Sequence, residues 1–248
     1  MTSKLKSYAT ATSMLFVLPT LLLLFVPGPA AIVHAAAPAM GDWNINGPET
    51  ETGKDIILSG NLTIGLGGTL TFDHVNLKMN CSFNAQFNIT IKAGGRLIMR
   101  NSSVAPVDFL QRYRYNFEIL GGGQAEIADS ELVAIGEGNF TQPQTMGLYI
   151  ESSGVKLINN RFTRTNIFYM AAAIIVGPLA SPRIEGNDIS GIYPTGIIFS
   201  MGSKSVVKGN IIKNNEKQCQ HYYQKQQFRF HTFFPPSPDP KFAKANRV

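Results

Sequence analysis

The chain has 248 residues and a formal net charge of +6, and 44% of its residues are hydrophobic. Lys4, Lys6 and the 7 basic against 2 acidic residues from Lys213 to Val248 account for this charge, because the body from 38 to 212 holds 13 basic and 14 acidic residues. The composition therefore argues against a nucleic-acid partner.

The first 37 residues have the organisation of a secretory signal. Lys4 and Lys6 precede an apolar run of 13 residues from 14 to 26, and small residues follow at 35 to 37. Pro27 and Pro29 interrupt the run before it reaches the length of a membrane span. We expect export, to a secreted, periplasmic or cell-surface location, with cleavage near 35 to 37. The alternative is an uncleaved anchor, which would be the only contact with a membrane.

Six segments that follow resemble one another. Each has a strand-like run, a turn of glycine or small residues and a second strand-like run, as in NITIKAGGRLIMRNSSV at 88–104. The copies are 61–77, 88–104, 116–132, 147–162, 173–189 and 196–212. Their last apolar residues are 27, 28, 30, 27 and 23 residues apart, a period that indicates a repeat protein.

Two columns of the aligned copies are apolar throughout. One column comprises Ile64, Ile91, Ile119, Ile150, Val176 and Phe199, and the other comprises Phe72, Met99, Ile127, Leu157, Ile184 and Val207. Hairpins would not require the same column to be apolar in every copy. The columns predict instead that each strand lies on the equivalent strand of the next copy, in an all-β parallel solenoid of about six coils with 23–30 residues each.

Asparagine recurs at a turn of the repeat. Stacked side-chain amides can donate hydrogen bonds from coil to coil, so we expect an asparagine ladder there. Its two neighbouring columns are Asn160, Asn187 and Asn210, and Asn101, Asp129 and Asn159.

The coil length, the apolar columns and two Gly-Asn-x-Ile turns (Gly186 to Ile189 and Gly209 to Ile212) carry a family resemblance. Over residues 55–215 the chain resembles the right-handed parallel β-helix repeat superfamily, which includes pectate lyases, polygalacturonases and periplasmic carbohydrate-binding or copper-delivery-associated repeat proteins. The resemblance implies a solenoid. In the enzymes, it implies carboxylates on neighbouring coils of one exposed face, with Ca²⁺ as a cofactor of the lyases.

The charged columns predict structure rather than catalysis. Opposite charges alternate from coil to coil at Glu131 and Arg161, and Glu126 precedes Lys156. Such pairs stabilise a sheet by about 0.2 to 1 kcal/mol each. The chain also lacks the motifs of the family's polygalacturonases and the aspartate cluster and arginine base of its lyases, so we predict no catalytic residues.

Metal and nucleotide sites are not supported either. Cys219 and His221 are two ligands without a second pair, so we expect no metal or cofactor. Gly65, Gly67 and Gly68 precede a strand-forming run rather than a helix, which makes them turn residues and not a phosphate loop. Cys81 and Cys219 could pair or remain free, and the oligomeric state stays open.

Aromatic residues gather in the loops that follow each coil. Because these loops leave at the same point of successive coils, we expect them to form a wall whose rings stack on sugars; the alternative is that the rings pack onto the solenoid flank. Phe83 and Phe87 lie in the first loop. The candidate glycan-binding residues are Phe109, Arg112, Tyr113, Arg114, Tyr115, Phe140, Phe168, Tyr169 and Tyr193.

Five sequons follow the signal, and N-glycosylation would occur in a host with that machinery. The acceptors are Asn61, Asn80, Asn88, Asn101 and Asn139. Asn101 also belongs to the predicted turn column, and an asparagine cannot be buried there while it carries a glycan.

The predicted organisation is a signal at 1–37, an N-terminal cap with Trp43 at 38–54, the β-helix at 55–215 and an irregular basic tail at 216–248. We predict an exported structural or glycan-binding protein whose partner is a polysaccharide or a cell-surface glycan. The alternative is a polysaccharide lyase or glycoside hydrolase, with or without a truncated C-terminus. Metal delivery has too few ligands to support it.

Overall fold

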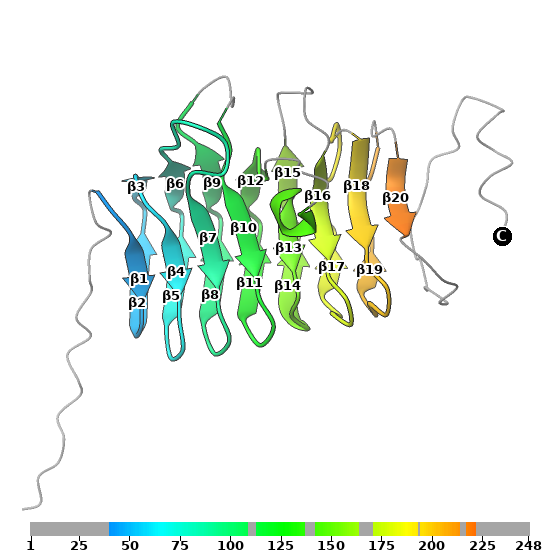
Figure 1. The fold of residues 1–248 in the computed structure, drawn as a ribbon, viewed down its shortest axis with the longest axis horizontal. Coiled ribbons are helices and arrows are strands. Elements are labelled where there is room, and N and C mark those ends of the chain that lie inside the picture. Colours follow the sequence, from blue (N-terminus) through cyan, green and yellow to red (C-terminus); the bar gives the residue numbers. More distant parts are fainter. Residues whose placement is uncertain are drawn as a thin grey trace, which may run out of the picture. The chain divides into compact units, whose positions relative to one another are not determined.

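Three parallel sheets build the protein in a computed structural model that describes residues 40–108, 113–136, 142–163, 171–192, 194–213 and 217–221. The first five described coils contribute one strand to each sheet in turn, so strands of successive coils lie side by side along one axis (Figure 1). The fold class is confirmed: every paired strand is parallel, and the repeat units pair with their neighbours rather than within themselves.

Sheet A has eight strands. They are β1 (Trp43–Ile45), β4 (Leu62–Ile64), β7 (Asn88–Ile91), β10 (Asn116–Ile119), β13 (Leu148–Ile150), β16 (Ala171–Val176), β18 (Pro194–Phe199) and β20 (Lys217–His221).

Sheet B has seven strands and sheet C has five. The strands of sheet B are β2 (Pro48–Thr52), β5 (Thr69–Asp73), β8 (Arg96–Arg100), β11 (Gln124–Ala128), β14 (Gly154–Ile158), β17 (Arg183–Glu185) and β19 (Val206–Lys208). Those of sheet C are β3 (Asp55–Leu58), β6 (Asn76–Met79), β9 (Ser103–Pro106), β12 (Glu131–Val133) and β15 (Arg161–Thr163). Single bridges from Arg161 through Asp188 to Ile211 extend sheet C beyond β15.

Both predicted apolar columns face the interior. All members of the first column are at most 1% exposed, and those of the second at most 4%. Strand register places each member opposite the next, as in Ile64, Ile91 and Ile119. The alternation of buried and exposed residues along each strand therefore fills one continuous core.

The first described coil begins earlier than expected. Residues 38–54, predicted as a cap, contain β1 and β2, which pair with β4 and β5 in the register of the later coils. The two inward positions of β2 hold glutamates, Glu49 and Glu51, opposite Leu70 and Phe72. These carboxylates interrupt the apolar columns, which is why the sequence pattern missed this coil.

The predicted tail also begins with regular structure. Residues 217–221 form β20, which pairs in parallel with β18. Residues 222–248 lie outside the described part of the chain.

The corner between sheets B and C, here called corner BC, has two residues in each coil with a strand in sheet C. The first is left-handed in every coil, with φ between 49° and 66°. This column comprises Gly53, His74, Asn101, Asp129, Asn159, Gly186 and Gly209. Glycine, asparagine and aspartate tolerate this conformation best, so the corner selects their recurrence.

The second residue of corner BC forms the predicted ladder. Asn187 is fully buried; its Oδ1 accepts hydrogen bonds from the backbone N and Nδ2 of Asn160, at 2.8 and 3.0 Å, and its Nδ2 donates to Asn210 Oδ1 at 2.9 Å. Ser130 and Ser102 continue the ladder, which the sequence analysis did not anticipate. The neighbouring column with Asn101 is exposed instead, and only Asn159 and Asp129 bond within it, at 3.2 Å.

Candidate functional site

The corner between sheets C and A, corner CA, carries the long loops of the molecule. Figure 1 shows the described loop from β6 to β7 at this edge, whereas the turns between sheets A and B (corner AB) are tight. The strand order places the connections that follow successive coils at this same corner, as predicted.

Of the predicted glycan-binding residues, the structure describes three. Tyr113 is 36% exposed, whereas Arg114 and Tyr115 are 1% and 0% exposed and pack onto the solenoid flank, which was the alternative. The Tyr115 hydroxyl donates to the carbonyl of Val104 at 3.0 Å, and the Arg114 backbone N donates to Asn84 Oδ1 at 3.2 Å. Both residues anchor loops to the solenoid flank, where apolar surface is removed from water.

Other members of that set lie outside the described residues. They are Phe109, Arg112, Phe140, Phe168, Tyr169 and Tyr193. Of the two aromatic residues in the first loop, Phe83 is 59% exposed and Phe87 packs partly buried against the core.

A row of outward side chains crosses the middle of sheet A and is here called the outer row. Strand register aligns one residue per coil, between inward residues such as Phe117 and Ile119 of β10. In chain order its described side chains are Asn44, Thr63, Thr90, Glu118, Tyr149, Ile175 and Ile198. The row is polar from Asn44 to Tyr149 and apolar beyond.

Two glutamates, called the glutamate pair, meet at the centre of the outer row. The Tyr149 hydroxyl donates to Glu151 Oε1 at 2.9 Å, and Glu118 lies opposite Tyr149 on β10. Burial raises the pKa of Glu118, and the negative charge of Glu151 raises it further. Burial and the same hydrogen bond raise the pKa of Tyr149, so this phenol stays a donor at neutral pH.

A short segment partly covers the apolar end of the outer row. The 3-10 helix η1 (Pro143–Thr145) lies against β10 and β13, and Met146 after it packs with Ala172, Ile175 and Ile198. Tyr149 packs against this cluster. The glutamate pair therefore adjoins a patch of apolar side chains rather than open water.

One predicted charge pair, Glu131 with Arg161, forms an ion pair, whereas Glu126 lies opposite the predicted Lys156 but accepts its hydrogen bond from Arg100. Arg100 Nη2 lies 2.7 Å from Glu126 Oε1, and this hydrogen bond lowers the pKa of Glu126. Arg161 and Glu131 face each other across sheet C, 3.8 Å apart. These pairs lie on sheets B and C and not on the outer row.

The sequons differ in what their asparagines do. Asn61 Oδ1 accepts from the backbone N of Asn88 at 3.0 Å, and Asn88 Oδ1 accepts from Asn116 Nδ2 at 3.0 Å, so these amides form a second ladder beside the outer row. Asn80 and Asn101 are exposed. Asn139 lies outside the described residues.

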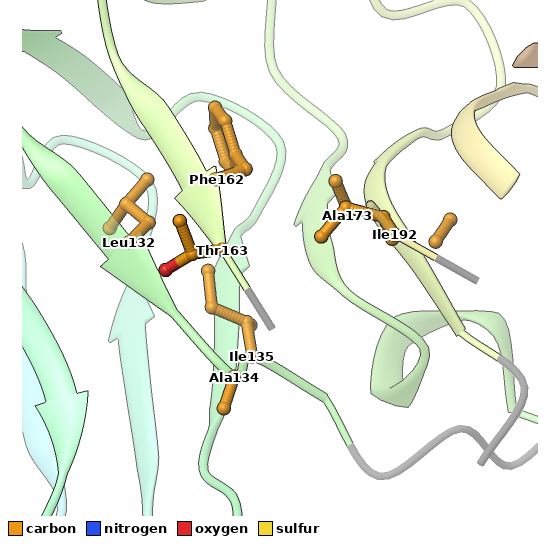
Figure 2. Close-up of a pocket in the computed structure, with 8 residues that line it drawn as sticks. Leu132, Ala134, Ile135, Phe162, Thr163, Ala173 and Ile192 are labelled. Atoms are coloured by element: carbon orange, nitrogen blue, oxygen red, sulfur yellow. The ribbon is translucent and has the colours of Figure 1, made fainter. Parts of the chain in front are cut away.

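A cavity at corner CA is too small for a ligand. Figure 2 shows apolar side chains around it, and its volume of about 10 Å³ is near the limit for one water molecule. Its lining residues are Leu132, Ala134, Ile135, Phe162, Thr163, Ala172, Ala173 and Ile192.

No group of three metal-ligating side chains occurs in the described part of the chain. Cys81 is buried without a disulfide. Among the residues that the structure describes, no helix combines the length and apolarity that a membrane crossing requires.

The sequence analysis missed the glutamate pair although a signal was present. The predicted apolar column with Ile64, Ile91 and Ile119 lies in the first strand of each copy, and the outer row lies in the same strands, one residue earlier and two residues before the turn. Its members vary from threonine to isoleucine, so no sequence motif marks them. The row can be found only when the copies are aligned on the adjacent buried column.

Residues 89–233 match the family model described as "Right handed beta helix region". No curated protein and no solved structure shows significant similarity to the chain.

Proposed function

Since the chain belongs to the right-handed β-helix family, we propose that it is an exported β-helix protein that binds an extended polysaccharide along the outer row of sheet A. The observation that carries this proposal is the polar part of the outer row: side chains that can form hydrogen bonds, from Asn44 to Tyr149, lie on five successive coils. The signal-like N-terminus supports export.

The row matches a polymer in its spacing and chemistry. Neighbouring strands are about 4.8 Å apart, so the row repeats its donors and acceptors at short, regular intervals. Sugar rings present hydroxyl groups at their edges and C–H groups on their faces. The polar part of the row, from Asn44 to Tyr149, suits the former, and the partly buried ring of Tyr149 suits the latter, because Ile175, Ile198 and Met146 are at most 7% exposed.

The loops of corner CA complete the proposed groove as one wall. Tyr113 contributes an exposed ring, and Phe109, Arg112, Phe140, Phe168, Tyr169 and Tyr193 remain proposed contacts. We also propose Asn80 and Asn101 as glycan acceptors, because glycans there would leave both buried ladders intact.

A glycan array with the purified chain tests the proposal, followed by titration of each hit. Thr90→Val with Glu118→Gln should weaken binding by roughly tenfold, because hydrogen bonds to charged groups contribute most. Thr71→Val is the matched control: it changes an equally placed threonine on sheet B and should leave the affinity within about twofold. An array without hits, or equal losses in both variants, would contradict glycan binding at this row.

A second candidate function rests on the glutamate pair. The raised pKa of Glu118 suits a general acid, and Glu151 supplies the second carboxylate of a glycoside hydrolase. Reducing ends released from array hits, with Ca²⁺ and with chelator, test for hydrolase or lyase activity. Glu118→Gln should abolish hydrolysis and Glu131→Gln should not; binding without any cleavage rules the enzyme out.

A further inference from the structure

The tight turns of corner AB share one unusual backbone position. In four coils its occupant is a glycine with φ between 74° and 80°: Gly67, Gly94, Gly122 and Gly202. In the coil of β16 and β17 the equivalent residue is Leu179, with φ of 61°. Each of these turns is closed by one backbone hydrogen bond, from the N of its fourth residue to the carbonyl of its first. Gly68 donates to Gly65 in this way, and Ala180 donates to Gly177.

Nothing within the described chain compensates for leucine at this position. A left-handed conformation is unfavourable for a branched aliphatic residue, and Leu179 is the only one among the described residues that adopts it. Its side chain is 78% exposed, so burial does not offset the strain. A strained leucine whose side chain is largely exposed suggests a contact with another molecule.

Leu179 is part of an exposed apolar group, here called the tip patch. Its side chain lies over Gly202 of the next turn, beside Met201, which is 65% exposed. Val206, 53% exposed, follows on β19. The turns between β16 and β17 and between β18 and β19, which carry Leu179 and Met201, project at one edge of the solenoid (Figure 1).

Basic side chains surround the tip patch. Lys204 lies in the same turn as Met201, Arg183 is opposite Val206, and Lys208 is two residues further along β19. Lys156 lies opposite Arg183 on β14, and all four are exposed. Among the residues that are aligned on β14, β17 and β19, Glu185 is the one acidic residue, and it forms an ion pair with Arg183.

We propose that the tip patch inserts into the surface of a bilayer that contains anionic lipids. Leucine and methionine on projecting turns enter a deformable acyl layer, whereas a protein partner would need a matching groove. Lysine and arginine at the rim complement the negative headgroups, as in other peripheral membrane proteins. This contact lies apart from the outer row of sheet A and does not depend on the proposed glycan function.

Vesicle flotation tests the proposal with the chain as processed by an exporting host. Phosphatidylglycerol–phosphatidylcholine vesicles should bind the wild type, and Leu179→Ser with Met201→Ser should lower the affinity by about tenfold or more. Lys204→Gln with Lys208→Gln should lower it by roughly fivefold per lysine, and salt should lower it too.

Leu66→Ser is the matched control, since Leu66 is 81% exposed at the same corner of another coil and should be replaceable without effect. Leu179→Gly guards against misfolding, because glycine relieves the strain and should still weaken vesicle binding. Absence of wild-type binding, equal binding to pure phosphatidylcholine, or equal loss in Leu66→Ser would overturn the proposal. So would a wild-type dimer that the double variant dissociates, which would assign the patch to a second copy.

Discussion

At the scale of single residues, the stability of the protein depends on positions where one coil departs from its neighbours. Leu179 occupies a glycine position, and Glu49 and Glu51 occupy apolar positions. Each of these residues should raise or lower the free energy of unfolding in a direction that can be measured.

Replacement of Leu179 by glycine should stabilise the protein. The left-handed backbone costs leucine about 1–2 kcal/mol, which the substitution removes. Glycine loses more conformational freedom on folding, and this reduces the gain by about 0.5–1 kcal/mol. We expect a net gain of about 0.5–1 kcal/mol in the free energy of unfolding, measured by urea denaturation. Leu66→Gly, equally exposed but outside the left-handed region, should lose stability.

Glu49 should make stability depend on pH. Burial raises its pKa most, opposed by the hydrogen bond from Trp43 Nε1 at 3.1 Å and assisted by Glu51. The pKa of Glu49 is higher in the folded protein than in the unfolded chain. The wild type therefore loses stability as the pH rises from about 4, the unfolded pKa, through the raised pKa of the folded protein. Glu49→Gln keeps an acceptor for Trp43 and should be more stable than the wild type at neutral pH, with no advantage near pH 4.

Glu126 provides the opposite sign for comparison. Arg100 lowers its pKa, so its contribution to stability is present at neutral pH and is lost as pH falls below the unfolded value. Glu126→Gln should therefore be less stable than the wild type at neutral pH. Thermal melts across pH that gave both variants the same trend would contradict this assignment.

At the scale of elements, the buried amide ladder sets the register of corner BC. The Asn187 side chain accepts two hydrogen bonds from Asn160 and donates to Asn210 and to two backbone carbonyls, and four of these five bonds are buried. Buried polar groups left without partners cost about 1–3 kcal/mol each. The ladder therefore determines the register of the corner, because any arrangement without it would leave buried polar groups unpaired.

Asn187→Ala should lower the free energy of unfolding by about 3 kcal/mol, since it leaves the Asn160 amide and the Leu157 carbonyl unpaired. Asn76→Ala is the control, because Asn76 bonds Asp55 at 2.8 Å on the exposed face. Its loss should stay within about 0.5 kcal/mol. Equal losses in the two variants would show that burial does not determine the value of the ladder.

Sequence periodicity predicts those elements whose residues repeat. The inward columns recur because every coil fills the same interior, and Asn160, Asn187 and Asn210 recur because every corner requires the same bonds. The first coil escaped prediction because Glu49 and Glu51 interrupt the pattern. The outer row and the buried Tyr115 escaped because solvent-facing and loop residues face no common constraint.

At the scale of the whole molecule, the first described coil limits growth along the axis. Among the described residues, β1, β2 and β3 are the first strands in their sheets, so within that part of the chain no strand pairs with their outer backbone groups. Glu51 is 2% exposed and pairs with Lys54, and Trp43 packs over Phe72 with ring centroids 5.9 Å apart. Inward charges at an open edge discourage the addition of further strands.

Glu49→Leu with Glu51→Phe should therefore produce concentration-dependent association. These residues reproduce the column at Leu70 and Phe72 and would present an apolar interior at an unpaired edge. Sedimentation velocity should show larger species than in the wild type. Thr50→Leu with Thr52→Phe places the same side chains on the outer side of β2, and equal association there would refute an effect of the interior.

Corner BC also determines how the molecule can diversify. Its two residues separate sheet B from sheet C in every coil that has a strand in sheet C, and its ladder continues through Asn187 and Asn210, whatever the length of the loops at corner CA. An insertion at corner CA thus leaves the strand register of the next coil unchanged, so shifts in register do not add up along the axis. The loops beside sheet A can be exchanged singly, much as hypervariable segments are exchanged on an immunoglobulin framework.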